Sequence, residues 1–160
     1  YLTGDGGYKD EDGYVFVMGR TDDVINVAGH RLSTGEMEEL IGGHEAVAEC
    51  AVVGIENELK GQVPAGFVVL KDGYTVDNES LESELVKVIR NNIGAIANFK
   101  QAAIVKRLPK TRSGKILRKS IRNLADHGNT PIPSTIDDPL IIDEIKDKME
   151  ELEIGIAFQR

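Results

Sequence analysis

The residues best suited to chemistry lie in one basic stretch, Pro109-Lys110-Thr111-Arg112-Ser113-Gly114-Lys115-Ile116-Leu117-Arg118. Proline and glycine favour an exposed loop, and the Lys115 ammonium can follow a phosphate or carboxylate oxygen as charge develops on it. A phosphate-binding P-loop is excluded, because it requires glycine where Pro109 stands and serine or threonine where Ile116 stands. Composition alone leaves a solvated basic surface as the competing interpretation.

Charge is distributed unevenly along the 160 residues. Residues 106–122 contain eight lysines and arginines and no acidic residue, and because the whole chain carries −8, the remainder carries −16. A basic segment on an acidic chain favours one local anionic ligand. Nucleic-acid binding is disfavoured because the segment contains no aromatic residue, and no apolar run is long enough to span a membrane. The single Cys50 suggests a buried, inert thiol in a reducing compartment.

Hydrophobic periodicity predicts a small α+β domain, with a short mixed sheet and flanking helices. Capping and turn residues set most of the expected boundaries. The expected strands are 14–18 (after a turn at 10–13), 24–27, 45–54, 63–70 and 101–105, and the expected helices are 33–43, 76–93, 116–124 and 141–152. We expect a hairpin at 1–21 from a preceding domain, a mobile domain at 22–128 and a peripheral, proline-punctuated tail at 129–160.

The sequence resembles the C-terminal part of the acyl-adenylate-forming enzymes, which include acyl-CoA synthetases, luciferases and peptide-synthetase adenylation domains. Three segments carry the resemblance in family order: Tyr1-Leu2-Thr3-Gly4-Asp5, the hinge-like segment 19–32 and the lysine segment 109–118. The residues of segments 26–31 and 54–62 are similar to those of short-chain synthetases of the acetyl-CoA and propionyl-CoA type. Segment 134–139 is more similar to the propionyl-CoA synthetases. A chain that opens without methionine is then expected to be a fragment.

The resemblance implies a two-step ligase. A carboxylate attacks the α-phosphate of Mg-ATP to give acyl-AMP and pyrophosphate, and the thiol of coenzyme A then takes the acyl group and releases AMP. Lys115 would act in the first step, while Asp5, Arg20 and Arg31 would bind nucleotide. Asp22 would be the hinge about which the small domain rotates.

Further roles follow from the same resemblance. Ala28 and Gly29 would approach the pantetheine arm of coenzyme A, and Arg90 would bind its 3′-phosphate. A structural cation site would be formed by backbone oxygens near Gly42 and Val47 together with His44, although the three histidines of the chain lack metal-ligand spacing. The remaining expected partners are the N-terminal domain and a lysine acetyltransferase or deacetylase acting on Lys115. The expected compartment is the cytoplasm or the mitochondrial matrix.

Simpler interpretations exist for several of these residues. In these interpretations Asp5 simply caps a turn, and Arg20 and Asp22 form a weak ion pair on the surface. Arg90 is then one charge on a hydrated helix face. At the level of the whole protein, two alternatives are an adenylation domain that loads another thiol acceptor and a non-catalytic module that binds anions or nucleic acid. The chain contains no Ser/Thr/Gly-rich phosphate loop or acyl pocket of the family, so we expect it to be inactive by itself.

Overall fold

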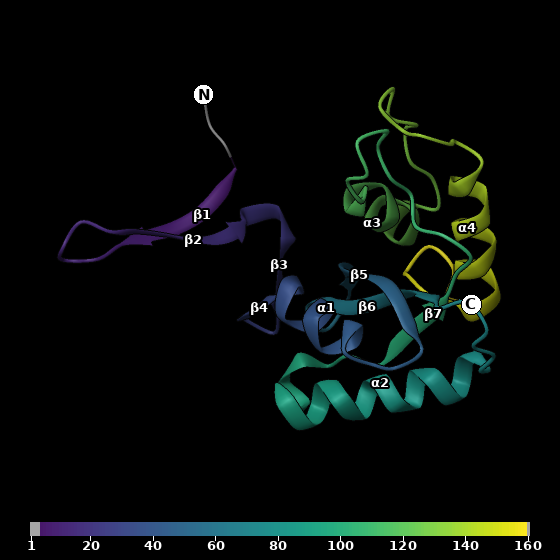
Figure 1. Ribbon diagram of the computed structural model, residues 1–160, viewed down its shortest axis with the longest axis horizontal. Helices are drawn as coiled ribbons and strands as arrows, with labels where there is room; N and C mark the ends of the chain where they lie inside the picture. The colour runs from purple at the N-terminus through teal and green to yellow at the C-terminus, as the bar shows by residue number, and fades with distance from the viewer. Residues whose placement is uncertain (1–3, 160) are drawn as a thin grey trace.

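The computed structural model describes residues 4–159, except for the side chains of Met18 and Asp22. Strands β1 (Asp5–Lys9) and β2 (Val15–Arg20) form a hairpin that projects from the rest of the described chain (Figure 1). The central sheet comprises β3 (Val24–Val27), β4 (His30–Ser33), β5 (Val47–Asn57), β6 (Gly61–Leu70) and β7 (Gln101–Ile104). The helices are α1 (Thr34–Gly42), α2 (Asn78–Asn92), α3 (Arg118–His127) and α4 (Ile141–Leu152), with short 3-10 turns η1 (Thr21–Asp23) and η2 (Ala95–Ala97).

The central sheet is built around β6, whose residues 64–68 are buried. Strand β6 pairs antiparallel with β5 along most of its length and parallel with β7, while β3 joins through the single pair Val27 and Gly61. Strands β3 and β4 form a second tight hairpin at the edge. The mixed sheet and four helices confirm the predicted small α+β domain.

The helices expected to begin at 33–34 and at 76 begin at Thr34 and Asn78, and both starts have a clear local cause. The Ser33 hydroxyl accepts the Glu36 N–H at 3.3 Å, and the Asp77 carboxylate accepts the Ser80 N–H at 2.8 Å, so each satisfies a backbone donor that the first helical turn leaves open. Hydrogen bonds to Ser80 lower the pKa of Asp77, as expected for a carboxylate that caps a helix.

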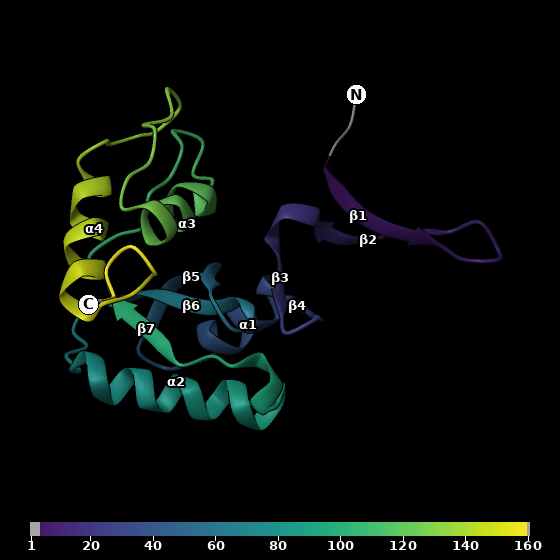
Figure 2. The same cartoon turned by 180° about the vertical axis from the view of Figure 1, so that it is seen from behind.

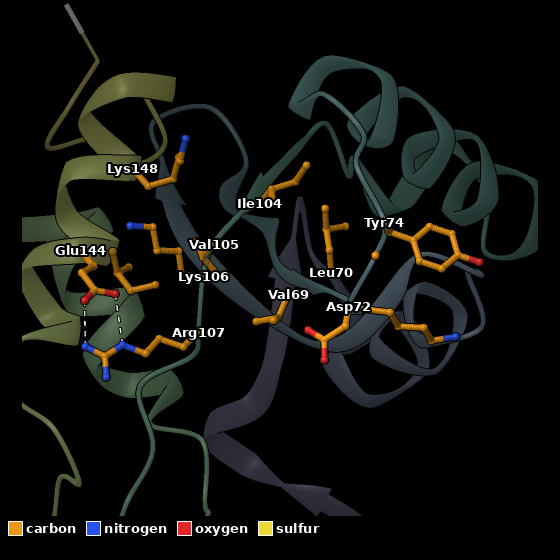
Figure 3. Close-up of a pocket in the computed structure, with 13 residues that line it drawn as sticks. Val69, Leu70, Asp72, Tyr74, Ile104, Val105, Lys106, Arg107, Glu144 and Lys148 are labelled. Atoms are coloured by element: carbon orange, nitrogen blue, oxygen red, sulfur yellow. Dashed lines mark hydrogen bonds and ion pairs between the residues drawn. The ribbon is translucent and has the colours of Figure 1, made fainter.

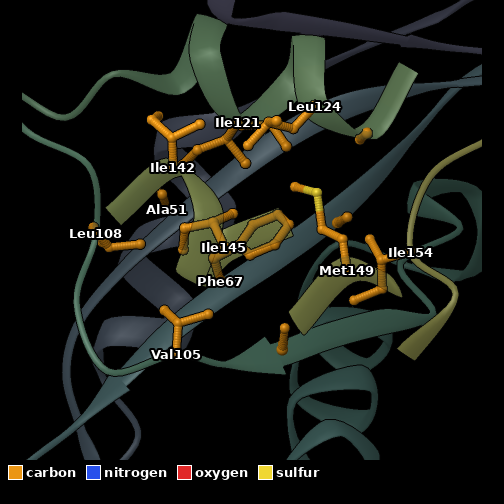
Figure 4. Close-up of a cluster of buried hydrophobic side chains, with 14 of the residues drawn as sticks. Ala51, Phe67, Val105, Leu108, Ile121, Leu124, Ile142, Ile145, Met149 and Ile154 are labelled. Atoms are coloured by element: carbon orange, nitrogen blue, oxygen red, sulfur yellow. The ribbon is translucent and has the colours of Figure 1, made fainter. Parts of the chain in front are cut away.

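The two faces of the sheet carry separate hydrophobic cores. Helices α1 and α2 cover one face with Met37, Ile41, Leu81, Leu85 and Ile89. Helices α3 and α4 cover the other face and enclose Phe67, and Figure 4 shows side chains of both helices around its ring. Figures 1 and 2 show the same arrangement from opposite sides, with α2 and α3 separated by the strands.

The tail is part of the core, so the prediction that residues 129–160 are peripheral is wrong. Ile136, Ile145, Met149 and Ile154 are each at most 6% exposed and pack in the cluster that contains Phe67. Proline and charge in the tail concealed this burial, because its apolar residues are separated by exposed acidic positions. The tail therefore belongs to the same folding unit as α3.

Other boundaries also differ from expectation. The helix expected at 116–124 begins at Arg118, because Ile116 bridges to Lys110 and the Leu117 N–H donates to the Pro109 carbonyl at 2.8 Å. Strand β4 was not predicted, and β5 extends to Asn57. None of the helices in residues 4–159 is long and apolar enough to cross a membrane.

We expect Gly155→Ala to destabilise the domain by about 3 kcal/mol, because a Cβ there would lie 2.3 Å from the Ala125 carbonyl oxygen and the residue has φ +98°. Gly128→Ala is the matched control. Its φ is +72°, but an added Cβ would meet only ordinary contact at 3.7 Å, so the expected cost is about 1 kcal/mol. Urea unfolding of both variants measures the difference, and equal losses would contradict the proposed overlap.

Candidate functional site

The Lys115 loop, which we define as residues 109–118, is folded on itself and presents Lys115 to solvent. The Thr111 N–H donates to the Lys115 carbonyl at 2.8 Å, and the Lys115 N–H donates to the Thr111 hydroxyl at 3.1 Å. Gly114 has φ +85°, which turns the chain just before the lysine. Within residues 4–159 no hydrogen bond or ion pair engages the exposed Lys115 ammonium, so it can reach an anion outside this loop.

Several other cations of the basic segment have acidic partners. Lys110 pairs with Glu49, and Arg107 pairs with Asp138 at 2.7 Å and with Glu144 at 2.8 Å. Hydrogen bonds to Glu144 and Asp138 raise the pKa of Arg107, and the same contacts lower the pKa of both carboxylates. The eight positive charges therefore do not form a uniform polyanion-binding surface.

Arg118 anchors the end of the Lys115 loop to α1. Its Nε and Nη2 donate to the two Glu38 carboxylate oxygens at 2.8 and 2.7 Å, and one of these oxygens also accepts the Val52 N–H at 2.9 Å. The hydrogen bonds to Glu38 raise the pKa of Arg118. Burial raises the pKa of the nearby Cys50 thiol to about 11, which agrees with an inert thiol.

We expect Arg118→Ala to lower the free energy of unfolding by about 2–3 kcal/mol, because it leaves the half-buried Glu38 carboxylate without its cation. The comparison variant is Lys110→Ala. The Lys110–Glu49 pair is about one-third exposed on both sides, so its loss should cost less than about 1 kcal/mol. Denaturant unfolding of the two variants tests this order, and a larger loss for Lys110→Ala would refute it.

Two of the predicted nucleotide-binding residues share one groove of about 380 Å³. Arg20 at the end of β2 and Arg31 on β4 line it together with Arg118, which sequence reasoning had not singled out. Asp5 is the register partner of Arg20 in the hairpin, and both residues take part in interactions. Lys115 does not line this groove.

Two sequence predictions fall partly outside the described residues. Tyr1, Leu2 and Thr3 of the first motif are not described. The side chain of Asp22, the predicted hinge, is also not described, although its backbone lies in η1 between β2 and β3. A short turn between the projecting hairpin and the sheet is a suitable position for a change in backbone angles.

Hydrogen bonds of Lys60 connect the turn at Ala28 and Gly29 with the groove that Arg90 lines. Ala28 and Gly29 form the two-residue turn between β3 and β4 with φ +48° and +87°, and the Ala28 N–H donates to the Lys60 carbonyl at 2.8 Å. The Lys60 ammonium donates to Asn98 Oδ1 at 2.8 Å. Asn98 lines a groove of about 260 Å³ with Arg90 and Lys100. Lys100 is a cation that the sequence pattern gave no reason to pair with Arg90.

Both ring nitrogens of His44, a residue of the predicted cation site, have partners within the chain. Its Nδ1 accepts the Ala46 N–H at 3.2 Å, so Nε2 carries the proton and donates to Glu84 at 2.7 Å. The His44 carbonyl accepts the Val47 N–H at 3.1 Å. No group of three potential metal-ligating side chains occurs in the described residues. The predicted site uses backbone oxygens near Gly42 and Val47, so it stays a prediction, and we assign no chemistry to a cation there.

Comparison with known proteins identifies the domain. Residues 36–115 match the family described as the AMP-binding enzyme C-terminal domain. The chain belongs to this family. The matched region ends at Lys115, so it contains the predicted coenzyme A residue Arg90 and most of the Lys115 loop, whereas α3 and the tail lie beyond it.

Several relatives of this AMP-binding C-terminal domain are acyl-CoA synthetases by name. It is 48% identical over 153 residues to the mitochondrial acyl-CoA synthetase short-chain family member B of Dictyostelium discoideum, an alignment of 96% of this chain and 22% of that protein. It is 46% identical over 157 residues to the acetyl-coenzyme A synthetase of Pyrobaculum arsenaticum, covering 98% and 23%. The chain thus spans less than a quarter of these relatives.

The fold agrees with a solved structure. ATP-bound MatB from Rhodopseudomonas palustris matches with a TM-score of 0.66 and 28% identity, over 77% of this chain and 24% of that one. The agreement confirms that the small α+β unit is the C-terminal domain fold of adenylate-forming enzymes.

One further cavity of this AMP-binding C-terminal domain lies apart from the predicted residues. It has a volume of about 480 Å³ between the ends of β6 and β7 and helix α4. Figure 3 shows Leu70 and Tyr74 on one side and Arg107 bound to Glu144 on the other. None of the predicted site residues lines it, so we place no step of the reaction there.

Proposed function

We propose that this chain forms the mobile C-terminal domain of an AMP-forming short-chain acyl-CoA synthetase. The supporting observation is the alignment of nearly the whole chain with proteins named as short-chain acyl-CoA and acetyl-CoA synthetases. The reaction joins a carboxylate to coenzyme A through acyl-AMP, with ATP entering as its magnesium complex. The names of the relatives support a short-chain carboxylate, with acetate named through acetyl-coenzyme A, and we propose acetate or propionate as the substrate.

The exposed Lys115 suits the first step. A carboxylate oxygen attacks the α-phosphorus of ATP and the bond to pyrophosphate breaks, so negative charge builds up on the α-phosphate oxygens and on the departing pyrophosphate. The Lys115 ammonium would stabilise this charge by bridging the carboxylate and the α-phosphate, and it has no competing partner in the described residues. Arg20, Arg31 and Asp5 would hold the nucleotide at the neighbouring groove.

The second step would use the other side of the domain. The Lys115 loop leads into α3 on one face of the sheet, whereas Arg90 lies at the end of α2 on the opposite face. One fixed orientation would not present both faces to the same substrate, so we propose a rotation about Asp22 between the steps. Arg90 would then bind the 3′-phosphate of coenzyme A, and its thiol would displace AMP from the acyl group.

The hairpin supports the proposed division of the chain. Val15 and Val17 of β2 are each 70% exposed, and Tyr8 stacks on Phe16 with ring centroids 4.9 Å apart. Such apolar surface on a projecting hairpin fits a contact with a larger N-terminal domain. We therefore assign residues 1–21 to that domain and residues 22–128 to the mobile unit, with the tail 129–160 packed on it.

Accessibility also supports regulation at Lys115. Acetylation by a lysine acetyltransferase would remove the charge that adenylation uses, and a deacetylase would restore it. The cytoplasm and the mitochondrial matrix are the two proposed compartments, and the Dictyostelium relative is named as mitochondrial.

The proposed function is tested by acyl-dependent exchange of pyrophosphate into ATP. The full-length enzyme should catalyse exchange with acetate or propionate. The 160-residue chain should catalyse none, because it contains neither a Ser/Thr/Gly-rich phosphate loop nor an acyl pocket. Coenzyme A should then convert the adenylate to acyl-CoA more rapidly than pantetheine does, since pantetheine lacks the phosphate proposed to bind Arg90. Exchange by the isolated chain, or no exchange by the full-length enzyme, would contradict the proposal.

A further inference from the structure

The tail crosses the outer edge of the Lys115 loop as a strand-like segment. The Arg112 N–H donates to the Thr135 carbonyl at 3.1 Å, and the Asp137 N–H donates to the Lys110 carbonyl at 2.9 Å. Thr111 and Ile136 form an antiparallel bridge between these two hydrogen bonds. We call residues 135–138 the tail strap. Its backbone is therefore paired with the loop that carries Lys115.

The tail strap is itself firmly attached. Ile136 is 6% exposed and packs in the core formed by α3 and α4. Asp138 accepts from Arg107 Nη1 at 2.7 Å, and the same guanidinium binds Glu144 of α4, as the dashed lines in Figure 3 show for the second contact. Arg107 precedes the loop in the sequence. The strap thus connects the core and α4 directly to the loop.

The remaining attachments of the loop lie at its two ends. Lys110 pairs with Glu49 at the start, and Arg118 pairs with Glu38 at the end. Apart from the contacts with the strap, residues 111–115 have only local hydrogen bonds within the described chain, from Thr111 to Ser113, Gly114 and Lys115. After Lys115, Ile116 bridges to Lys110, and the side chains of Ile116 and Leu117 pack against the core. Gly114 adds backbone freedom in the same stretch. The tail strap is accordingly the support from outside the loop for residues 110–112, on the N-terminal side of Lys115.

We propose that the tail strap is a positioning element that holds the Lys115 loop in its adenylation-competent shape. This inference rests on the proposed role of Lys115. A lysine stabilises developing charge efficiently only when its backbone is already ordered, because ordering during the reaction would raise the barrier. Loosening the strap therefore slows adenylation. It leaves thioester formation unchanged, because Lys115 has no role in that step.

The test compares Asp137→Pro with Asp137→Ala in the full-length enzyme. Proline removes the N–H that donates to Lys110, whereas alanine removes the exposed carboxylate and keeps that N–H. We expect Asp137→Pro to lower acetate- or propionate-dependent pyrophosphate exchange roughly tenfold, as for a misplaced catalytic group. Formation of acyl-CoA from supplied acyl-AMP should stay near the wild-type rate in both variants, and Asp137→Ala should retain exchange.

Hydrogen exchange provides a second measurement on the same proteins. In Asp137→Pro the amides of Arg112, Gly114 and Lys115 should lose protection, while amides in α2 keep theirs. A general loss of folding would instead affect α2 and both half-reactions. Equal rates of pyrophosphate exchange in the proline and alanine variants, or unchanged protection of the loop amides, would overturn the proposed role of the tail strap. If Lys115→Ala lost pyrophosphate exchange and Asp137→Pro kept it, only the proposed role of the tail strap would be overturned. Full pyrophosphate exchange in Lys115→Ala would overturn the proposed function.

Discussion

Replacing Lys115 by alanine in the full-length enzyme is expected to reduce acyl-adenylate formation by a factor of about 10²–10³. The variant loses an exposed ammonium with no partner in residues 4–159, so little folding stability should be lost with it. Coenzyme A should still react with supplied acyl-AMP at close to the normal rate. Pyrophosphate exchange measures the first step, and acyl-CoA release from acyl-AMP measures the second.

The matched control for this prediction is Lys106→Ala. Lys106 belongs to the same basic segment and is also exposed, but it lines the cavity beside α4 instead of the Lys115 loop. Its removal takes away one positive charge and should leave both half-reactions intact. A similar loss of exchange in the two variants would show that net charge, not the placement of Lys115, is responsible. Equal loss of both half-reactions in Lys115→Ala would contradict its assignment to adenylation.

Local physical chemistry explains how much of the fold was predictable. Leu81, Leu85 and Ile89 recur at helical spacing and are all buried on one face of α2. Ser33 and Asp77 cap the helices that follow them. These signals operate within a few residues, so they can be recognised without knowing what the element packs against.

The tail was misjudged because its burial depends on distant partners. Ile136 and Met149 become core residues only when α4 packs beside α3 and over Phe67. Similarly, Glu38 on α1 binds Arg118, which is 80 residues away in the sequence. Neither contact has a periodic signature in the sequence. Long-range packing therefore determines both the core beneath α3 and α4 and the anchors of the Lys115 loop.

The candidate site was predictable as motifs but not as an arrangement. Arg20 and Arg31 come together in one groove, whereas Lys115 and Arg90 lie with elements on opposite faces of the sheet. Sequence spacing does not reveal this separation. The separation matters because a domain with two functional faces must present them in turn, and the alternation can then be tested by blocking each face separately.

Blocking the proposed coenzyme A site with Gly29→Leu is expected to impair thioester formation and spare adenylation, which is the opposite of the result expected for Lys115→Ala. Gly29 occupies an exposed turn with φ +87°, and an added Cβ would meet no atom of this chain within 4 Å. The domain should therefore fold, at a cost of about 1–2 kcal/mol for the backbone conformation. The side chain would instead project where the pantetheine arm is proposed to pass. Thioester formation should fall about 100-fold or more, since the steric block acts on that step alone.

Gly73→Leu separates the steric block from backbone strain. Gly73 is also exposed, has φ +84° and has no atom within 4 Å of an added Cβ, but it lies in the turn between β6 and α2. Both variants therefore incur similar strain, and only Gly29→Leu should lose acyl-CoA formation from acyl-AMP. Pyrophosphate exchange should persist in both because adenylation uses the Lys115 face. If Gly29→Leu lost exchange as well, the two faces would not act in separate steps, and the rotation about Asp22 would lose its rationale.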